Sequence, residues 1–273
     1  MPVIISLIIL SFITYMSYLI FFWQWKKNCQ PFYYKDKPIV IGHRGSPSLI
    51  TENTIPSFQK AIEQGVDGLE FDIRLSKDNQ VVIFHDTTLQ RLSNQNDHIA
   101  ELSLTALQSV ILNKKEKQQE KTYIPSLNDA IPLLHQSKVI NIEIKSDGLF
   151  QGQNLLVPLV RFLDKHKIDD RCIISSFNPL ILMKLRLQRP ETVIGFLYNR
   201  KRFFHTLDNM IWMLRVQPEN LHIHYSMLNS WIIKWARKKG MRINSYTIND
   251  KEIYTKFRSK IDGVFTDNIE YIK

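Results

Sequence analysis

The feature that most constrains the fold is a regular alternation that begins at residue 38. From there to the C-terminus, short apolar runs alternate with amphipathic segments of helical period, a pattern that favours parallel βαβ units. We expect strands at Ile39–His43, Gly68–Arg74, Val81–His85, Val139–Lys145, Cys172–Ser176, Thr192–Leu197, Leu221–His224, Arg242–Ile248 and Gly263–Thr266. We expect helices at Ile55–Gln64, Asn128–Gln136, Leu155–His166, Pro179–Gln188, Ser230–Lys239 and Lys251–Ser259.

One of these nine strands does not fit a parallel arrangement. Only six residues separate Arg74 from Val81, whereas a parallel crossover needs about a dozen or more. We therefore expect an antiparallel hairpin that turns near Lys77–Gln80. The other eight strands then close an α/β fold, a (β/α)₈ TIM barrel, with the hairpin at the end where such barrels carry their active sites.

The N-terminal segment has a different composition. Val3–Trp25 contains no charged residue, and 23 such residues are enough to span about 30 Å of hydrocarbon as a helix. A signal peptide would need a basic n-region and a small-residue cleavage site, so we expect an uncleaved, single-pass transmembrane helix. Lys26 and Lys27 then place the rest of the chain in the cytoplasm. The expected organisation is a membrane anchor (1–27), a linker (28–37) and a barrel domain (38–273).

Charged side chains occur in pairs on two of the expected strands. Glu70 and Asp72 alternate on one strand, and Glu143 and Lys145 on another, so each pair faces one side of its strand. Charged pairs inside a barrel are costly unless they serve a ligand or a metal. Three carboxylates supply the oxygen ligands that Mg²⁺ and Ca²⁺ prefer. The sequence therefore predicts a site for a hard divalent cation, beside an acid/base pair made by His43 and His85.

Six ordered motifs resemble the glycerophosphodiester phosphodiesterase family. They are HRG, ENT, E-x-D, K-D, V-x-x-H-D and I-E-I-K, and the resemblance runs from about Pro38 to Asp267. It implies a (β/α)₈ fold of the PLC-like phosphodiesterase type. It also implies metal-dependent hydrolysis of glycerophosphodiesters to sn-glycerol 3-phosphate and an alcohol.

The same resemblance implies a role for each site residue. His43 and His85 would be the general acid and base, a task that suits imidazole near neutral pH. Arg44 and Lys145 would contact the phosphate, and Tyr246 would replace a family tryptophan as an apolar wall under the glycerol. One divalent cation, Mg²⁺ or Ca²⁺, would be bound by Glu70, Asp72 and Glu143. The sequence leaves open which histidine is the acid and whether water or a glycerol hydroxyl attacks.

Two alternative functions stay open at this point. A lysophospholipase D would use the same mechanism on membrane lysophospholipids, and Tyr198–Val216 is either a barrel helix or a segment that lies on the membrane surface. A non-catalytic module that binds phospholipid headgroups is the second alternative, although it would not need two titrating histidines. The net charge of +10 attracts anions, but it is spread along the chain without an aromatic-interleaved motif, which argues against nucleic acid. The sequence does not indicate the oligomeric state.

Overall fold

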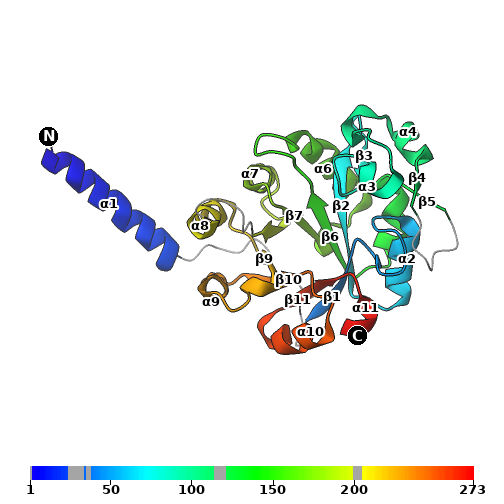
Figure 1. Cartoon of the computed structure of the whole chain (residues 1–273). Helices are drawn as coiled ribbons and strands as arrows, with labels where there is room; N and C mark the ends of the chain where they lie inside the picture. The colour runs from blue at the N-terminus through cyan, green and yellow to red at the C-terminus, as the bar shows by residue number, and fades with distance from the viewer. Residues whose placement is uncertain (1, 24–33, 35–37, 114–120, 199–204) are drawn as a thin grey trace.

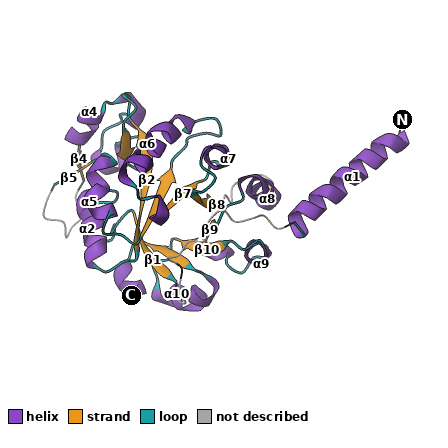
Figure 2. Cartoon of the chain, turned by 180° about the vertical axis from the view of Figure 1, so that it is seen from behind, coloured by secondary structure: helices purple, strands orange, loops and turns teal. Residues whose placement is uncertain are grey.

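A closed barrel of parallel strands forms the centre of the molecule, with helices around it (Figures 1 and 2). The computed structural model describes residues 2–23, 34, 38–113, 121–198 and 205–273. The eight barrel strands are β1 (Ile39–His43), β2 (Gly68–Leu75), β6 (Val139–Ile144), β7 (Cys172–Ser176), β8 (Val193–Leu197), β9 (Asn220–His224), β10 (Arg242–Tyr246) and β11 (Gly263–Thr266). Pairing of β1 with both β11 and β2 closes the barrel. The predicted (β/α)₈ architecture is confirmed.

Helices cover the outside of the barrel. They are α2 (Ile55–Glu63), α5 (Ile131–Leu134), α6 (Leu156–His166), α7 (Pro179–Gln188), α8 (His205–Val216), α9 (Trp231–Lys238), α10 (Lys251–Phe257) and α11 (Ile269–Ile272). Helix α2 begins as its sequence indicates, because the Thr54 hydroxyl accepts a hydrogen bond from the Ser57 amide and Pro56 occupies the first turn. Helix α8 buries Met210 and Met213, as a barrel helix does, while residues 199–204 of the segment discussed above lie outside the described residues.

The hairpin next to the barrel is also confirmed. Strand β3 (Val81–Ile83) pairs with β2 in antiparallel register, with Ile73 opposite Ile83. Asn79 turns the chain with φ of 57°, a left-handed conformation that asparagine tolerates better than most residues. The following segment holds elements that we did not predict: the helices α3 (Gln90–Ser93) and α4 (Leu104–Ser109), and a small sheet of β4 (Ile111–Leu112) and β5 (Thr122–Tyr123).

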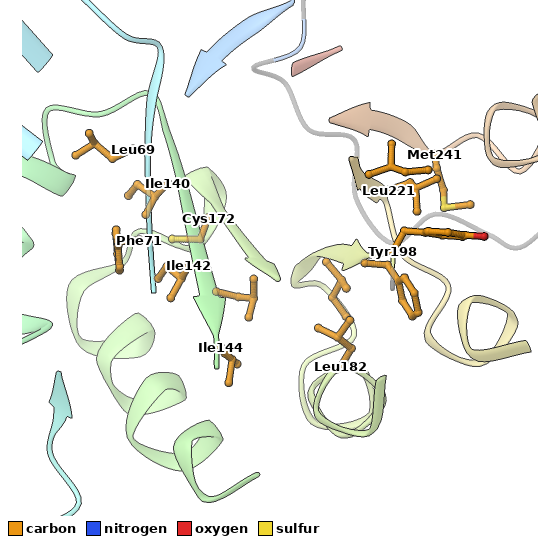
Figure 3. Packing of buried hydrophobic residues seen from close by; sticks show 14 of the residues in the cluster. Leu69, Phe71, Ile140, Ile142, Ile144, Cys172, Leu182, Tyr198, Leu221 and Met241 are labelled. Carbon is orange, nitrogen blue, oxygen red and sulfur yellow. The ribbon is translucent and has the colours of Figure 1, made fainter. Parts of the chain in front are cut away.

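Side chains alternate between two environments along each barrel strand. On β2, Leu69 and Phe71 belong to the large apolar cluster between the barrel and its helices, whereas Glu70 and Asp72 face the interior. Figure 3 shows part of this cluster, with Ile140, Ile142 and Ile144 of β6 near Phe71. Burial of each such side chain stabilises the fold by about 1.5–3 kcal/mol. The outer apolar layer therefore holds the strands in a register that points their polar residues inward.

The N-terminal segment forms helix α1 (Pro2–Phe21), which extends away from the barrel in both views (Figures 1 and 2). Among the residues that the structure describes, none of the helices combines the length and the apolar character needed to cross a membrane. The predicted transmembrane helix is therefore wrong, and so are the membrane contact through it and the single-pass membrane localisation.

The helix is also shorter than the predicted span of Val3–Trp25. The helix ends at Phe21, and its last turn is bound to the barrel domain. The Trp235 indole donates to the carbonyl oxygen of Ile20 at 2.7 Å, and the Lys239 ammonium donates to that of Leu19 at 3.1 Å. The two lysines at positions 26 and 27, on which the cytoplasmic topology depended, lie outside the described residues.

The turn at Asn79 yields a prediction about stability. Asn79→Val is expected to lower the free energy of unfolding by about 1–2 kcal/mol, because a β-branched residue resists the left-handed conformation. Asn79→Gly is the matched control and is expected to preserve stability, since glycine adopts a positive φ without strain. Urea denaturation of both variants checks this, and equal stability of the two would contradict it.

Candidate active site

A cavity of about 150 Å³ lies where the barrel strands end. Its lining residues are His43, Arg44, Glu70, His85, Asn141, Glu143, Lys145, Phe177, Leu197, His222, Tyr246, Thr247 and Phe265. Every predicted site residue except Asp72 is among them. Asp72 is fully buried beside the cavity and forms ion pairs with two of the lining residues, Arg44 and Lys145. The structure therefore brings the whole predicted set together.

Three buried carboxylates form the most acidic part of this site. Glu70, Asp72 and Glu143 each offer one oxygen, and these oxygens lie within 4.8 Å of one another. Glu70 Oε1 is buried and has no hydrogen-bond partner in the described part of the chain. Burial, and then the charge of Asp72, raise the pKa of Glu70. A buried carboxylate oxygen without a partner is costly, so these residues fit a divalent cation that prefers oxygen ligands.

Two cations balance part of the acidic charge. The guanidinium of Arg44 lies 3.1 Å from Asp72 Oδ2 through Nε and donates from Nη1 to Glu52 at 2.7 Å. The ammonium of Lys145 lies 3.0 Å from Asp72 Oδ1 and donates to Glu143 at 2.5 Å. Burial alone would raise the pKa of Asp72, but these two cations hold it well below its usual range. Asp72 therefore stays ionised inside the barrel.

The loop after β1 reaches back to the carboxylates. The backbone amide of Arg44, at a left-handed φ of 57°, donates to Glu70 Oε2 at 2.8 Å. The side-chain amide of Asn53 donates to Asp72 Oδ2 at 2.8 Å and accepts from the Asp72 backbone amide at 3.3 Å. Asn53 of the E-N-T motif thus orients the buried carboxylate of Asp72, a task that the sequence alone did not indicate.

His43 is oriented by a carboxylate from the other end of the chain. Its Nδ1 lies 2.6 Å from Asp267 Oδ1, and the amide of Asn249 donates to the other Asp267 oxygen at 2.7 Å. Its Nε2 lies on the acidic side, 4.0 Å from Glu70 Oε2. Burial lowers the pKa of His43, but the charge of Glu70 and the hydrogen bond with Asp267 raise it further, so the net shift is upward.

His85 has a similar arrangement with its own neighbour in sequence. Its Nδ1 lies 2.6 Å from Asp86 Oδ1, and Arg91 donates from Nε to the other Asp86 oxygen at 2.6 Å. Burial lowers the pKa of His85, and the nearby cations Lys145 and Arg44 also lower it. The sequence placed Asp267 at the end of the last strand without giving it a role, and it did not single out Asp86, although Asp86 belongs to the V-x-x-H-D motif.

An outer cavity of about 300 Å³ adjoins the first one. Both are lined by His85, Glu143, Lys145 and Phe177, whereas His43 lines only the inner one. The further lining residues of the outer cavity are mostly polar: Arg74, Asp86, Thr87, Ile144, Ser146, Ser176 and Asn178. Tyr246 lines the inner cavity, where its ring packs edge to face against that of Phe177, with 6.2 Å between the ring centroids.

Comparison with known proteins agrees with this geometry. Residues 43–271 match the model of the glycerophosphoryl diester phosphodiesterase family. The chain belongs to this family. A glycerophosphodiester phosphodiesterase of Caldanaerobacter subterraneus subsp. tengcongensis is 30% identical over 239 residues, which cover 86% of this chain and 96% of the relative.

Solved structures of phosphodiesterases resemble the chain in sequence and in fold. The glycerophosphodiester phosphodiesterase of Thermotoga maritima has a TM-score of 0.72 and 31% identity, covering 87% of this chain and 97% of that one. A phosphodiesterase of Oleispira antarctica, solved with the product sn-glycerol-3-phosphate, has a TM-score of 0.75 and 30% identity, covering 86% and 95%. The chain is thus an enzyme of glycerophosphodiester hydrolysis, as the sequence motifs predicted.

The acidic site predicts that a divalent cation stabilises the protein. At a free concentration of Mg²⁺ or Ca²⁺ about 100 times the dissociation constant, the free energy of unfolding should rise by about 2.7 kcal/mol. Glu143→Gln should remove most of this gain, because one charged ligand is lost, whereas Glu63→Gln, on the exposed surface of α2, should keep it. Thermal unfolding with and without the cation checks this, and an unchanged melting temperature of the unsubstituted protein in both cations would refute it.

Proposed function

We propose that residues 38–273 form a catalytic domain that hydrolyses glycerophosphodiesters to sn-glycerol 3-phosphate and an alcohol, with His43 and His85 as the acid/base pair. The observation that carries the proposal is the common geometry of the two histidines. Each is held through Nδ1 by a carboxylate at 2.6 Å, and both line the cavity that contains Glu70 and Glu143. With Nδ1–H donated to a carboxylate, Nε2 of each imidazole is available for proton transfer.

The charged residues have complementary tasks in this scheme. A phosphodiester is an anion that repels nucleophiles, so Arg44 and Lys145 would bind its phosphoryl oxygens and balance the charge that develops on them. Glu70, Asp72 and Glu143 would hold one divalent cation, Mg²⁺ or Ca²⁺, which supplies Lewis-acid stabilisation of the same oxygens when bound. Tyr246 would form one wall of the glycerol site.

The two cavities support a division of labour between the histidines. We propose that the glycerol occupies the inner cavity and the alcohol the outer one, which His85 lines and His43 does not. His43 then takes the proton of the attacking oxygen as a new P–O bond forms. His85 donates a proton to the alcohol oxygen as the old P–O bond breaks. Addition of one water overall yields the two products.

Deacylated substrates are favoured over lysophospholipids for two reasons. The outer cavity is lined largely by polar groups, which suit a small polar alcohol better than lipid. Helix α8, the segment that would otherwise lie on a membrane, buries Met210 and Met213 against the barrel. The chain belongs to a family of enzymes, which also argues against the alternative of a non-catalytic module that binds phospholipid headgroups.

The first test is release of sn-glycerol 3-phosphate from glycerophosphocholine by the purified full chain. EDTA should abolish turnover, and His43→Ala and His85→Ala should each lower kcat by about 10²- to 10⁴-fold, the usual contribution of a general acid or base. His135→Ala, at an exposed histidine outside both cavities, is the matched control. Turnover of lysophosphatidylcholine alone would favour lysophospholipase D, and turnover of neither would overturn the proposal.

A second test separates the roles of the histidines. A glycerol phosphodiester with a p-nitrophenyl leaving group needs no proton on departure, so His85→Ala should recover most of its lost activity on this substrate. His43→Ala should stay impaired, because the attacking oxygen still has to lose its proton. The opposite result would assign the acid to His43. If each variant lost the same factor in kcat on the p-nitrophenyl substrate as on glycerophosphocholine, the result would argue against paired acid/base catalysis.

A further inference from the structure

Arg91 on α3 binds two carboxylates at the edge of the site, and the proposed mechanism gives it no task. Its Nε donates to Asp86 Oδ2 at 2.6 Å. Its Nη1 and Nη2 donate to the two oxygens of Glu52 at 2.9 and 2.7 Å. Arg91 is not among the lining residues of either cavity, so it holds these two carboxylates from outside the substrate site.

Stability of the fold does not account for this arrangement. The Arg91 side chain is 46% exposed, and an ion pair at an exposed position contributes only about 0–1 kcal/mol to the free energy of unfolding. A guanidinium differs from an ammonium in its geometry, because its donors lie in one plane and point in fixed directions. Arg91 therefore holds Asp86 and Glu52 in a defined orientation relative to each other.

Both oxygens of Asp86 are engaged, one by Arg91 and the other by His85. Asp86 Oδ1 lies 2.6 Å from Nδ1 of the imidazole. Burial raises the pKa of Asp86, but the hydrogen bonds from His85 and Arg91 lower it further, so the net shift is downward. Asp86 thus stays an ionised acceptor whose carboxylate plane is fixed. The orientation of this carboxylate sets the direction in which Nε2 of His85 points.

The position of Arg91 relative to His85 is fixed by a small apolar core. Leu89 and Leu92, on either side of Arg91 in the sequence, are buried in a cluster that is separate from the main core. Phe84, the residue before His85, belongs to the same cluster. The segment that follows the hairpin is thus a platform that supports both the arginine and the histidine.

We propose that Arg91 is a positioning residue for His85: it holds Asp86, and Asp86 directs the imidazole toward the oxygen of the departing alcohol. The main chain of His85 is held separately, because Arg74 donates from Nε to its carbonyl oxygen at 2.9 Å. Loss of Arg91 should therefore misdirect the side chain and leave the loop in place. The inference rests on the proposed function, in which His85 is the general acid.

The test is steady-state turnover by the Arg91→Met variant of the full chain on two substrates, glycerophosphocholine and the p-nitrophenyl diester. On glycerophosphocholine, kcat should fall by about 10- to 100-fold, less than the roughly 10²- to 10⁴-fold effect expected from loss of the acid itself. On the p-nitrophenyl diester, the loss should stay below about 3-fold, because this leaving group departs without a proton. KM should change little, since Arg91 lines neither cavity.

Two further variants identify the path by which Arg91 acts. Arg91→Lys should retain an intermediate kcat, because a single ammonium cannot reproduce the forked contacts with both carboxylates. The double variant Arg91→Met/His85→Ala should be no slower than His85→Ala alone, because a residue that acts through His85 has no effect once the imidazole is gone. A double variant that is slower by the full Arg91→Met factor would overturn the proposal.

Arg189→Met is the matched control. Arg189 also joins two carboxylates, Asp164 at 2.5 Å and Asp169 at 2.7 Å, and it lines neither cavity. Its kcat on both substrates should equal that of the unsubstituted enzyme.

Equal losses of Arg91→Met on both substrates would show that this arginine is only structural. The comparison does not depend on the fraction of folded enzyme, because both rates come from one preparation. Absence of turnover by the unsubstituted enzyme, or a His85→Ala variant whose activity does not recover on the p-nitrophenyl diester, would instead refute the proposed function. The two failures are therefore distinguishable.

Discussion

Compensation of buried charge is the constraint on which the rest of this structure depends. Three carboxylates lie close together inside the barrel, and in the described part of the chain Arg44 and Lys145 form ion pairs with two of them, Asp72 and Glu143. Removing such groups from water costs several kcal/mol per ion unless partners replace the lost hydration. The apolar layer between barrel and helices supplies the rigidity that keeps these partners in place. A cluster of three carboxylates with fewer direct cationic partners fits the divalent cation proposed above.

A chain of charged residues connects His85 to the loop that follows His43. Asp86, which holds His85, is bound by Arg91, and Arg91 also binds Glu52 at 2.7 Å. Glu52 in turn accepts from Arg44, whose guanidinium faces Asp72. A continuous chain of ion pairs therefore runs from the hairpin side of the site to the loop after β1. If one charged residue of this chain moved, the next would lose its ion-pair partner. The loop after β1 and the segment after β3 are therefore held together.

The period of the sequence was enough to predict the barrel and the site but not the details of its support. Alternation along β2 and β6 placed the carboxylates correctly, and the six-residue gap after Arg74 identified the hairpin. The elements between Asp86 and Ser126 were missed because they are short and lack a clear period. The predicted anchor is wrong because no described helix has the length and apolar character of a membrane span. The sequence also did not indicate that the end of α1 contacts the barrel domain.

The hydrogen bond between His43 and Asp267 joins residues that are 224 positions apart in the chain. The carboxylates on β2 and β6 and the histidine after β3 all lie before residue 144, on strands that are neighbours in the sheet, so most of the site can assemble from nearby strands. Only the pairing of β1 with β11 brings Asp267 to its histidine. A chain that ended before β11 would keep the three carboxylates but would lack the partner of His43 Nδ1. Closure of the barrel between its first and last strands is therefore also the step that completes the orientation of this histidine.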